Sequence, residues 1–126
     1  MDTATHARTA VVAELLSALD AYAQWLSALR ERSGFAAGSL STGQDELQKV
    51  LELRRTSCPL LTREATELLV VHTQLANLLY ECQLRTVRGC TTANAGELSQ
   101  CADLVQRQVA AIELLRRAVA RESSEH

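Results

Sequence analysis

The stretch PLLTREATELLVVHTQLANLLYECQLRTV, residues 59–87, decides the fold of this chain. Its apolar residues recur at alternating steps of four and three, the spacing of one face of an α-helix. The members of that face are Leu61, Ala65, Leu68, His72, Leu75, Leu79 and Cys82. A second apolar stripe, about a third of a turn away, consists of Leu69, Ala76, Tyr80, Leu84 and Val87. A helix that is apolar on two sides needs more than one neighbour, so we expect a central helix here.

Three further helices are predicted around it. Residues 5–33 and 92–121 each keep a seven-residue apolar repeat. Residues 41–56 form a shorter predicted helix that ends in Arg54 and Arg55, cations that suit a helix carboxyl terminus. Short connections make successive helices antiparallel. We therefore predict an all-α fold with one domain over residues 1–126, an antiparallel up-down bundle of three long helices and one short helix. Residues 122–126 are expected to fray.

The boundary near Pro59 leaves two alternatives. Proline is tolerated in the first turn of a helix, so Pro59 fits a separate helix over residues 58–88. Alternatively, one long helix runs from Ser41 to Arg88 and is kinked at Pro59. We favour separate helices.

Composition and charge exclude several classes of protein. Apolar residues make up 47% of the 126 positions and charged residues 22%, as is typical of a globular domain. With a net charge of −2 and no basic run, the sequence predicts no nucleic-acid partner. Glu14 and Asp20 interrupt the first apolar residues, and no apolar run approaches about 20 residues. We expect no signal peptide, no membrane insertion and a cytoplasmic or nucleoplasmic location.

The sequence also lacks the patterns that carry chemistry. It contains no Gly-rich phosphate loop and no nucleophile motif. The four cysteines form no C-x-x-C pair and have no histidine at ligand spacing: Cys58, Cys82, Cys90 and Cys101. We predict a non-enzyme without a metal, cofactor or small-molecule substrate. The cysteines are expected to be thiols, with Cys58 partly exposed near a helix end, and a thiol or metal protein stays as an alternative.

A buried polar layer is the most specific structural prediction. If the last two helices are antiparallel about residues 88–92, facing positions sum to about 180. His72 then faces Gln108, and Tyr22 falls at a similar height, where its hydroxyl can join them. Such a layer fixes helix register at some cost in stability. The alternative is that His72 and Gln108 reach the rim separately and bind solvent.

The sequence contains more apolar residues than are needed to fill the buried seam between the helices of a small bundle. The residues in excess are Leu60, Leu69, Val70, Tyr80, Leu84 and Val87. Large exposed apolar patches usually mark association sites, although these side chains can also belong to the core. We predict a protein–protein interaction module that associates with itself, as a homo-oligomer, or serves as a subunit or adaptor in a larger assembly.

Residues 75–89, LANLLYECQLRTVRG, resemble the third-helix tract of FlgN-type flagellar export chaperones. That tract has apolar residues, a Cys-Gln or similar pair, and two asparagines before a glycine. Cys82 and Gln83 match the pair, whereas Thr86 and Gly89 stand where the asparagines would be. The resemblance covers about an eighth of the chain. It implies an alternative function, a secretion or export chaperone whose helical bundle binds an amphipathic client segment.

Overall fold

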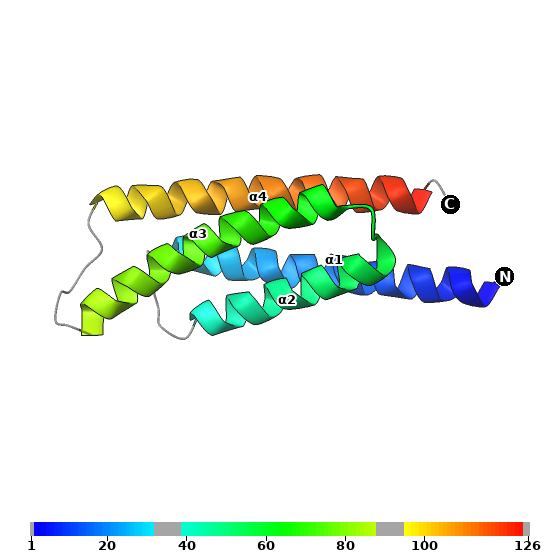
Figure 1. Ribbon diagram of the computed structural model, residues 1–126, viewed down its shortest axis with the longest axis horizontal. Helices are drawn as coiled ribbons and strands as arrows, with labels where there is room; N and C mark the ends of the chain where they lie inside the picture. Colours follow the sequence, from blue (N-terminus) through cyan, green and yellow to red (C-terminus); the bar gives the residue numbers. More distant parts are fainter. Residues whose placement is uncertain (1, 32–38, 88–94, 125–126) are drawn as a thin grey trace.

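The computed structural model describes the backbone of residues 2–31, 39–87 and 95–124. Side chains are described for residues 10–29, 41–81, 96–97 and 99–122. The helices are α1 (Asp2–Glu31), α2 (Ser39–Ser57), α3 (Thr62–Val87) and α4 (Ala95–Ser124), and these ranges contain no strand. The predicted all-α class is therefore confirmed. In Figure 1 the chain runs out along α1, back along α2, out along α3 and back along α4.

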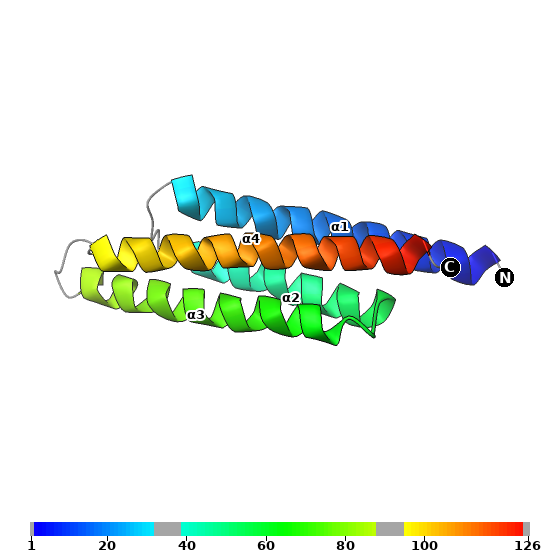
Figure 2. The same cartoon turned by 90° about the horizontal axis from the view of Figure 1, so that it is seen from above.

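Each helix lies beside two others. α1 packs along α2 and α4, and α3 packs along α4 and, less closely, along α2. Seen from above in Figure 2, α4 lies over α2, with α1 and α3 on either side. The sparse packing between α2 and α3 leaves one side of α3 open.

The core is aliphatic and is supplied by all four helices. Its fully buried aliphatic side chains include Leu15, Leu19, Leu26, Val50, Leu68, Val71, Leu75, Leu115 and Val119. Burial of each Leu or Val contributes about 1.5–3 kcal/mol. On α3 the buried residues Ala65, Leu68, His72, Leu75 and Leu79 follow the first stripe of the sequence. That stripe faces the core because its period matches the helical turn.

The turn between α2 and α3 differs from the prediction. The Cys58 amide donates to the Arg54 carbonyl at 2.7 Å, so Cys58 still completes the last turn of α2. The Leu61 carbonyl accepts the first bond of the next helix, from the Ala65 amide at 3.3 Å. α3 therefore begins at Thr62, and Pro59 lies in the turn before it. One helix kinked at Pro59 is excluded, and the expected partial exposure of Cys58 is wrong, because its side chain is buried in the core.

The other helix ends also differ from the expected bounds. α1 begins at Asp2 and α2 at Ser39, both earlier than expected. α4 continues to Ser124, so residues 122–124, expected to fray, are helical. Residues 32, 33, 88 and 92–94 of the expected helices lie outside the described residues.

α1 and α2 approach closely at one glycine. A Cβ atom built on Gly43 collides with the six-membered ring of the Trp25 indole. Glycine inside a helix costs roughly 0.5–1 kcal/mol relative to alanine. Here the missing side chain makes room for Trp25, which is buried in the core.

Candidate functional site

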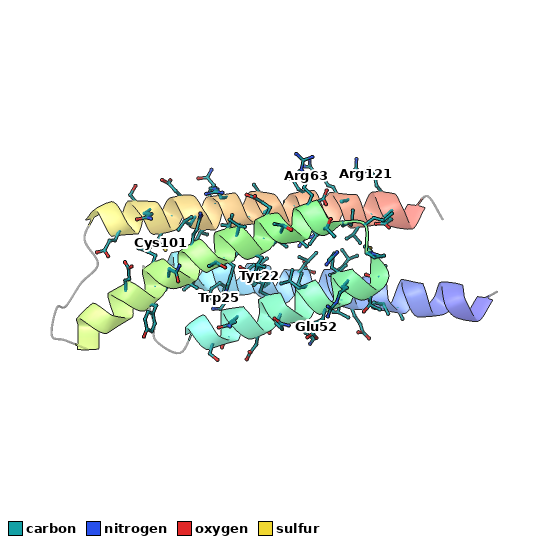
Figure 3. All side chains as sticks on the ribbon, in the orientation of Figure 1. Tyr22, Trp25, Glu52, Arg63, Cys101 and Arg121 are labelled. Carbon is teal, nitrogen blue, oxygen red and sulfur yellow. The ribbon has the colours of Figure 1, made fainter. Side chains whose placement is uncertain are left out.

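Three polar side chains from three helices meet inside the bundle. The hydroxyl of Tyr22 (α1) lies 2.7 Å from Nδ1 of His72 (α3). Gln108 (α4) donates from Nε2 to the Tyr22 oxygen and to the Leu68 carbonyl oxygen, at 2.8 Å in each case. All three side chains are buried, and Tyr22 lies well inside the bundle in Figure 3. We call Tyr22, His72 and Gln108 the buried polar cluster.

The bonds of the buried polar cluster constrain its protons. Gln108 uses both amide hydrogens, one of them on the Tyr22 oxygen. The bond between the Tyr22 hydroxyl and Nδ1 of His72 forms with either nitrogen of the neutral imidazole protonated. Only the form with the proton on Nε2 lets the Tyr22 hydroxyl donate its own hydrogen. The sequence placed His72 opposite Gln108, and the structure joins them through the Tyr22 oxygen.

Two polar atoms of the buried polar cluster form no hydrogen bond. Among the described residues, His72 Nε2 and Gln108 Oε1 have no hydrogen-bond partner. A buried polar atom without a partner costs about 1–3 kcal/mol. The cluster thus adds little net stability, and its physical effect is to set the relative positions of α1, α3 and α4.

Burial determines the charge state of the buried polar cluster. It raises the pKa of Tyr22 well above its usual value, and the hydrogen bond from Gln108 opposes this rise. Burial lowers the pKa of His72 below 6.5. The indole of Trp25 stacks on Tyr22 with ring centroids 5.6 Å apart and lies 5.7 Å from the His72 ring. Both titratable side chains are therefore neutral near pH 7, among aromatic neighbours.

The residues predicted to form an interface lie on or next to α3. Leu69, Val70 and Tyr80 are 47%, 43% and 55% exposed, and Leu60, in the turn before α3, is 83% exposed. We call Leu69, Val70 and Tyr80 the α3 apolar stripe. The side chains of Leu84 and Val87 lie outside those that the structure describes.

Two further exposed apolar residues were not predicted, Val109 and Leu114 on α4. Leu114 is 59% exposed, although it stands next to the fully buried Leu115. Successive residues of a helix differ by about 100° in direction, so a core stripe centred on Leu115 turns Leu114 outward. The exposure of Leu114 could have been predicted from the sequence. If the buried stripe of this helix is centred on Gln108 and Leu115, Leu114 falls outside it.

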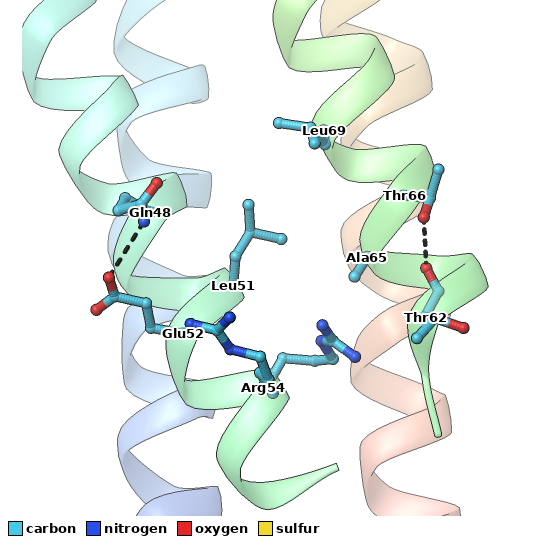
Figure 4. A pocket seen from close by; sticks show the side chains of 9 residues that line it. Gln48, Leu51, Glu52, Arg54, Thr62, Ala65, Thr66 and Leu69 are labelled. Carbon is cyan, nitrogen blue, oxygen red and sulfur yellow. Dashed lines mark hydrogen bonds between the residues drawn. The ribbon is translucent and has the colours of Figure 1, made fainter. Parts of the chain in front are cut away.

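A groove of about 270 Å³ lies between α2 and α3, where packing is sparse. Figure 4 shows Leu69 reaching from α3 toward α2, with Leu51 and Arg54 on the opposite wall. The lining mixes apolar, polar and charged side chains: Gln48, Leu51, Glu52, Arg54, Arg55, Thr62, Ala65, Thr66 and Leu69. Gln48 donates to Glu52 at 3.1 Å and Arg54 to the Pro59 carbonyl at 3.4 Å.

Ion pairs on the surface link α4 to its neighbours. Arg116 contacts Asp20 of α1 at 2.7 Å and Glu113 of its own helix at 2.9 Å. Arg107 contacts Glu67 of α3 at 3.4 Å. Exposed pairs of this kind contribute about 0–1 kcal/mol, so they support the bundle less than the core does.

The described residues include no group of three or more His, Cys, Asp or Glu side chains placed to hold a metal ion. Cys58 is a buried thiol and Cys101 a half-buried one, and the side chains of Cys82 and Cys90 lie outside those described. Across the described ranges, none of the helices has the length and apolar content needed to cross a membrane. Compared with known proteins, the chain matches no family model, no curated protein and no solved structure.

Proposed function

We propose that this chain is a non-enzymatic protein–protein interaction module, a helical-bundle subunit or adaptor that acts through the α3 apolar stripe. The supporting observation is the exposure of Leu69, Val70 and Tyr80 on one helix, with the almost fully exposed Leu60 in the turn before it. Scattered exposed apolar residues are normal in monomers. A set gathered on and beside one helix is typical of an association surface.

The energetic reason is the cost of hydrated apolar surface. Removing apolar surface from water contributes about 25 cal/mol per Å². Leu69 and Tyr80 each leave about half of their surface in water within one chain. A partner that covers them gains this contribution without rearranging the core, because the core of α3 uses other residues.

Photocrosslinking tests the proposal. A photoreactive amino acid replaces Tyr80 in one variant and Gln100, exposed on α4, in a matched control. Irradiation in an extract of the natural source is expected to give protein adducts from position 80 and none from position 100. Leu69→Asp in the position-80 variant is expected to abolish the adducts while circular dichroism shows an intact fold. Equal adducts from both positions would contradict an interface on α3.

The groove between α2 and α3 favours a second candidate function, a chaperone-like carrier for an amphipathic client helix. Leu51, Ala65 and Leu69 could accept apolar side chains of such a helix, and Arg54 and Arg55 its carboxylates. The resemblance of residues 75–89 to FlgN-type chaperones agrees with this candidate and stays a prediction. Such a carrier is a monomer that binds its client in the groove. In the photocrosslinking experiment, Leu51→Asp should therefore abolish the adducts between the carrier and its client.

A further inference from the structure

One side of α3 carries only uncharged residues from its start to Tyr80. These residues recur at alternating steps of four and three, so they lie along one line on the helix. We call them the uncharged face of α3: Thr62, Thr66, Leu69, Thr73, Ala76 and Tyr80. At about 100° per residue, the charged residues with described side chains lie about 100° or more around α3 from Tyr80. They are Arg63, Glu64, Glu67 and Glu81.

Two threonines of the uncharged face use their hydroxyl groups within α3. The hydroxyl of Thr66 donates to the Thr62 carbonyl oxygen at 2.7 Å, and that of Thr73 donates to the Leu69 carbonyl oxygen at 2.8 Å. A hydroxyl that is bonded inside its own helix does not need water or a partner group to accept its hydrogen. A partner can therefore cover both positions with apolar side chains without the loss of these hydrogen bonds.

The uncharged face of α3 is continuous with the groove between α2 and α3. Thr62, Thr66 and Leu69 belong to both, and in Figure 4 Leu69 reaches from α3 toward α2. Of the four pairs of neighbouring helices, α2 and α3 pack least closely. The face and the groove therefore form one recess with a wall on each helix, which side chains from one face of a further helix can enter.

The charges that line the groove belong to the α2 wall and gather near the turn before α3. Within the part of the chain that the structure describes, Arg55 forms no hydrogen bond or ion pair. Arg54 donates to the Pro59 carbonyl at 3.4 Å, and its buried Nε has no described partner. Glu52 is the one anion among the described lining residues, and its Oε1 already accepts from Gln48 at 3.1 Å. This end of the groove is therefore positive, with guanidinium donors to spare.

We infer that the partner of the α3 apolar stripe is an amphipathic helix of a different protein. This helix lies along the uncharged face of α3, with carboxylates at the end next to the turn between α2 and α3. The inference rests on the proposed function and specifies its partner. From Thr62 to Tyr80 the face extends about 27 Å, so about 18 helical residues cover it.

The chemistry of the recess determines which residues this partner needs. Apolar side chains at steps of three and four cover Leu69 and Tyr80, as in other helices bound in grooves. Val70 lies about 80° around α3 from Tyr80, at the rim of this contact. Carboxylates of the partner pair with Arg54 and Arg55, whereas a cation at the same end is repelled.

A second copy of this chain does not fit the same recess. In the second copy α2 stands beside the uncharged face, so the α3 helices of two copies cannot enter each other's grooves. Beyond Leu60 and α3, the exposed large apolar residues among those described are Val109 and Leu114 of α4. They are about 140° apart around their helix and form no common stripe. The recess therefore favours a helix that presents an apolar face without a flanking helix.

The test is the binding of two synthetic 18-residue helical peptides to the purified chain, measured by fluorescence anisotropy. Both peptides carry leucine at alternating steps of four and three. One has two glutamates at one end, and the other has two lysines at the same positions. Each peptide is made with the charged pair at the amino end and again at the carboxyl end, and the tighter version identifies the direction of the bound helix.

The native chain is expected to bind the glutamate peptide one to one, at least about tenfold more tightly than the lysine peptide. This difference should shrink at high salt. Arg55→Glu should abolish or reverse the preference, and Leu69→Asp should weaken the binding of both peptides at least about tenfold, with an intact fold by circular dichroism. Arg117→Glu, exposed on α4, is the control and should leave both dissociation constants within about twofold.

Each contrary result overturns a separate statement. Equal affinity for the two peptides overturns the acidic end of the partner, and binding that survives Leu69→Asp overturns the uncharged face as the site. A dimer in sedimentation equilibrium whose position-80 adducts join two copies overturns the different protein as partner. If neither peptide binds, a helix as partner is overturned, yet adducts between position 80 and a different protein still support an interaction module. The absence of both binding and adducts overturns the inference and the proposed function together.

Discussion

The Tyr22 hydroxyl oxygen lies 2.7 Å from Nδ1 of His72, although the two residues are 50 positions apart in the chain. The same oxygen accepts a hydrogen bond from Gln108. One atom therefore connects α1, α3 and α4, and a shift of any of these helices by one turn, 5.4 Å, breaks a buried hydrogen bond.

Tyr22→Phe should destabilise the protein. The substitution leaves Nδ1 of His72 and one amide hydrogen of Gln108 without a partner inside the core. We expect a loss of about 1–3 kcal/mol in the free energy of unfolding, measured by urea denaturation. Tyr80→Phe, on the exposed part of α3, is the matched control and should stay within about 0.5 kcal/mol. Equal effects at both positions would show that the Tyr22 hydroxyl has no structural role.

Acid should weaken the fold through His72. Burial lowers its folded pKa below the unfolded value of 6.5, so the unfolded chain binds more protons as the pH falls. The stability contributed by neutral His72 is therefore complete above the unfolded pKa and is lost progressively below it. We expect the urea midpoint to fall between pH 7 and pH 5, with a smaller fall in His72→Gln. The same pH dependence in both proteins would assign it to other groups.

Gly43→Ala should destabilise the protein, although alanine is the better helix former by roughly 1 kcal/mol. The added methyl collides with the Trp25 ring, and overpacking of a core typically costs about 1–3 kcal/mol. Gly96→Ala, at an exposed position of α4, is the control and should be neutral or slightly stabilising. Thermal melts of the two variants distinguish the outcomes. A more stable Gly43→Ala would show that α1 and α2 are further apart at this point.

Leu75→Ala should remove part of the central core. Leu75 is fully buried, and truncating a buried leucine costs about 2–5 kcal/mol. Leu114→Ala removes the same atoms from a side chain that is 59% exposed and should cost far less. Urea denaturation of both variants compares them directly. A small loss at Leu75 would mean that the surrounding core can collapse into the space.

The sequence predicted those features that depend on helical period. The stripe through Leu68, His72 and Leu75 is buried as expected, because a 3.6-residue period fixes which side chains share a face. The positions of His72 and Gln108 along the bundle followed from the turn that connects their helices. Both inferences need only local geometry and chain connectivity.

Features that depend on contacts between helices could not be predicted in this way. The start of α3 at Thr62 depends on the turn between α2 and α3, where the Cys58 amide donates to the Arg54 carbonyl and extends the bonding of α2 one residue past Ser57. The need for glycine at position 43 follows from the position of Trp25 on a different helix. Propensity alone favours a residue other than glycine inside a helix.

The buried polar cluster also has a consequence for the evolution of this chain. Its three side chains are joined through the Tyr22 oxygen. A change at position 22 alone therefore leaves polar atoms of both His72 and Gln108 without a partner, and a change at position 72 or 108 alone removes one partner of the Tyr22 hydroxyl. Replacing a whole buried polar set by apolar residues of similar volume is often neutral or stabilising. Natural relatives are therefore expected to vary at these three positions together, keeping the set or replacing all of it.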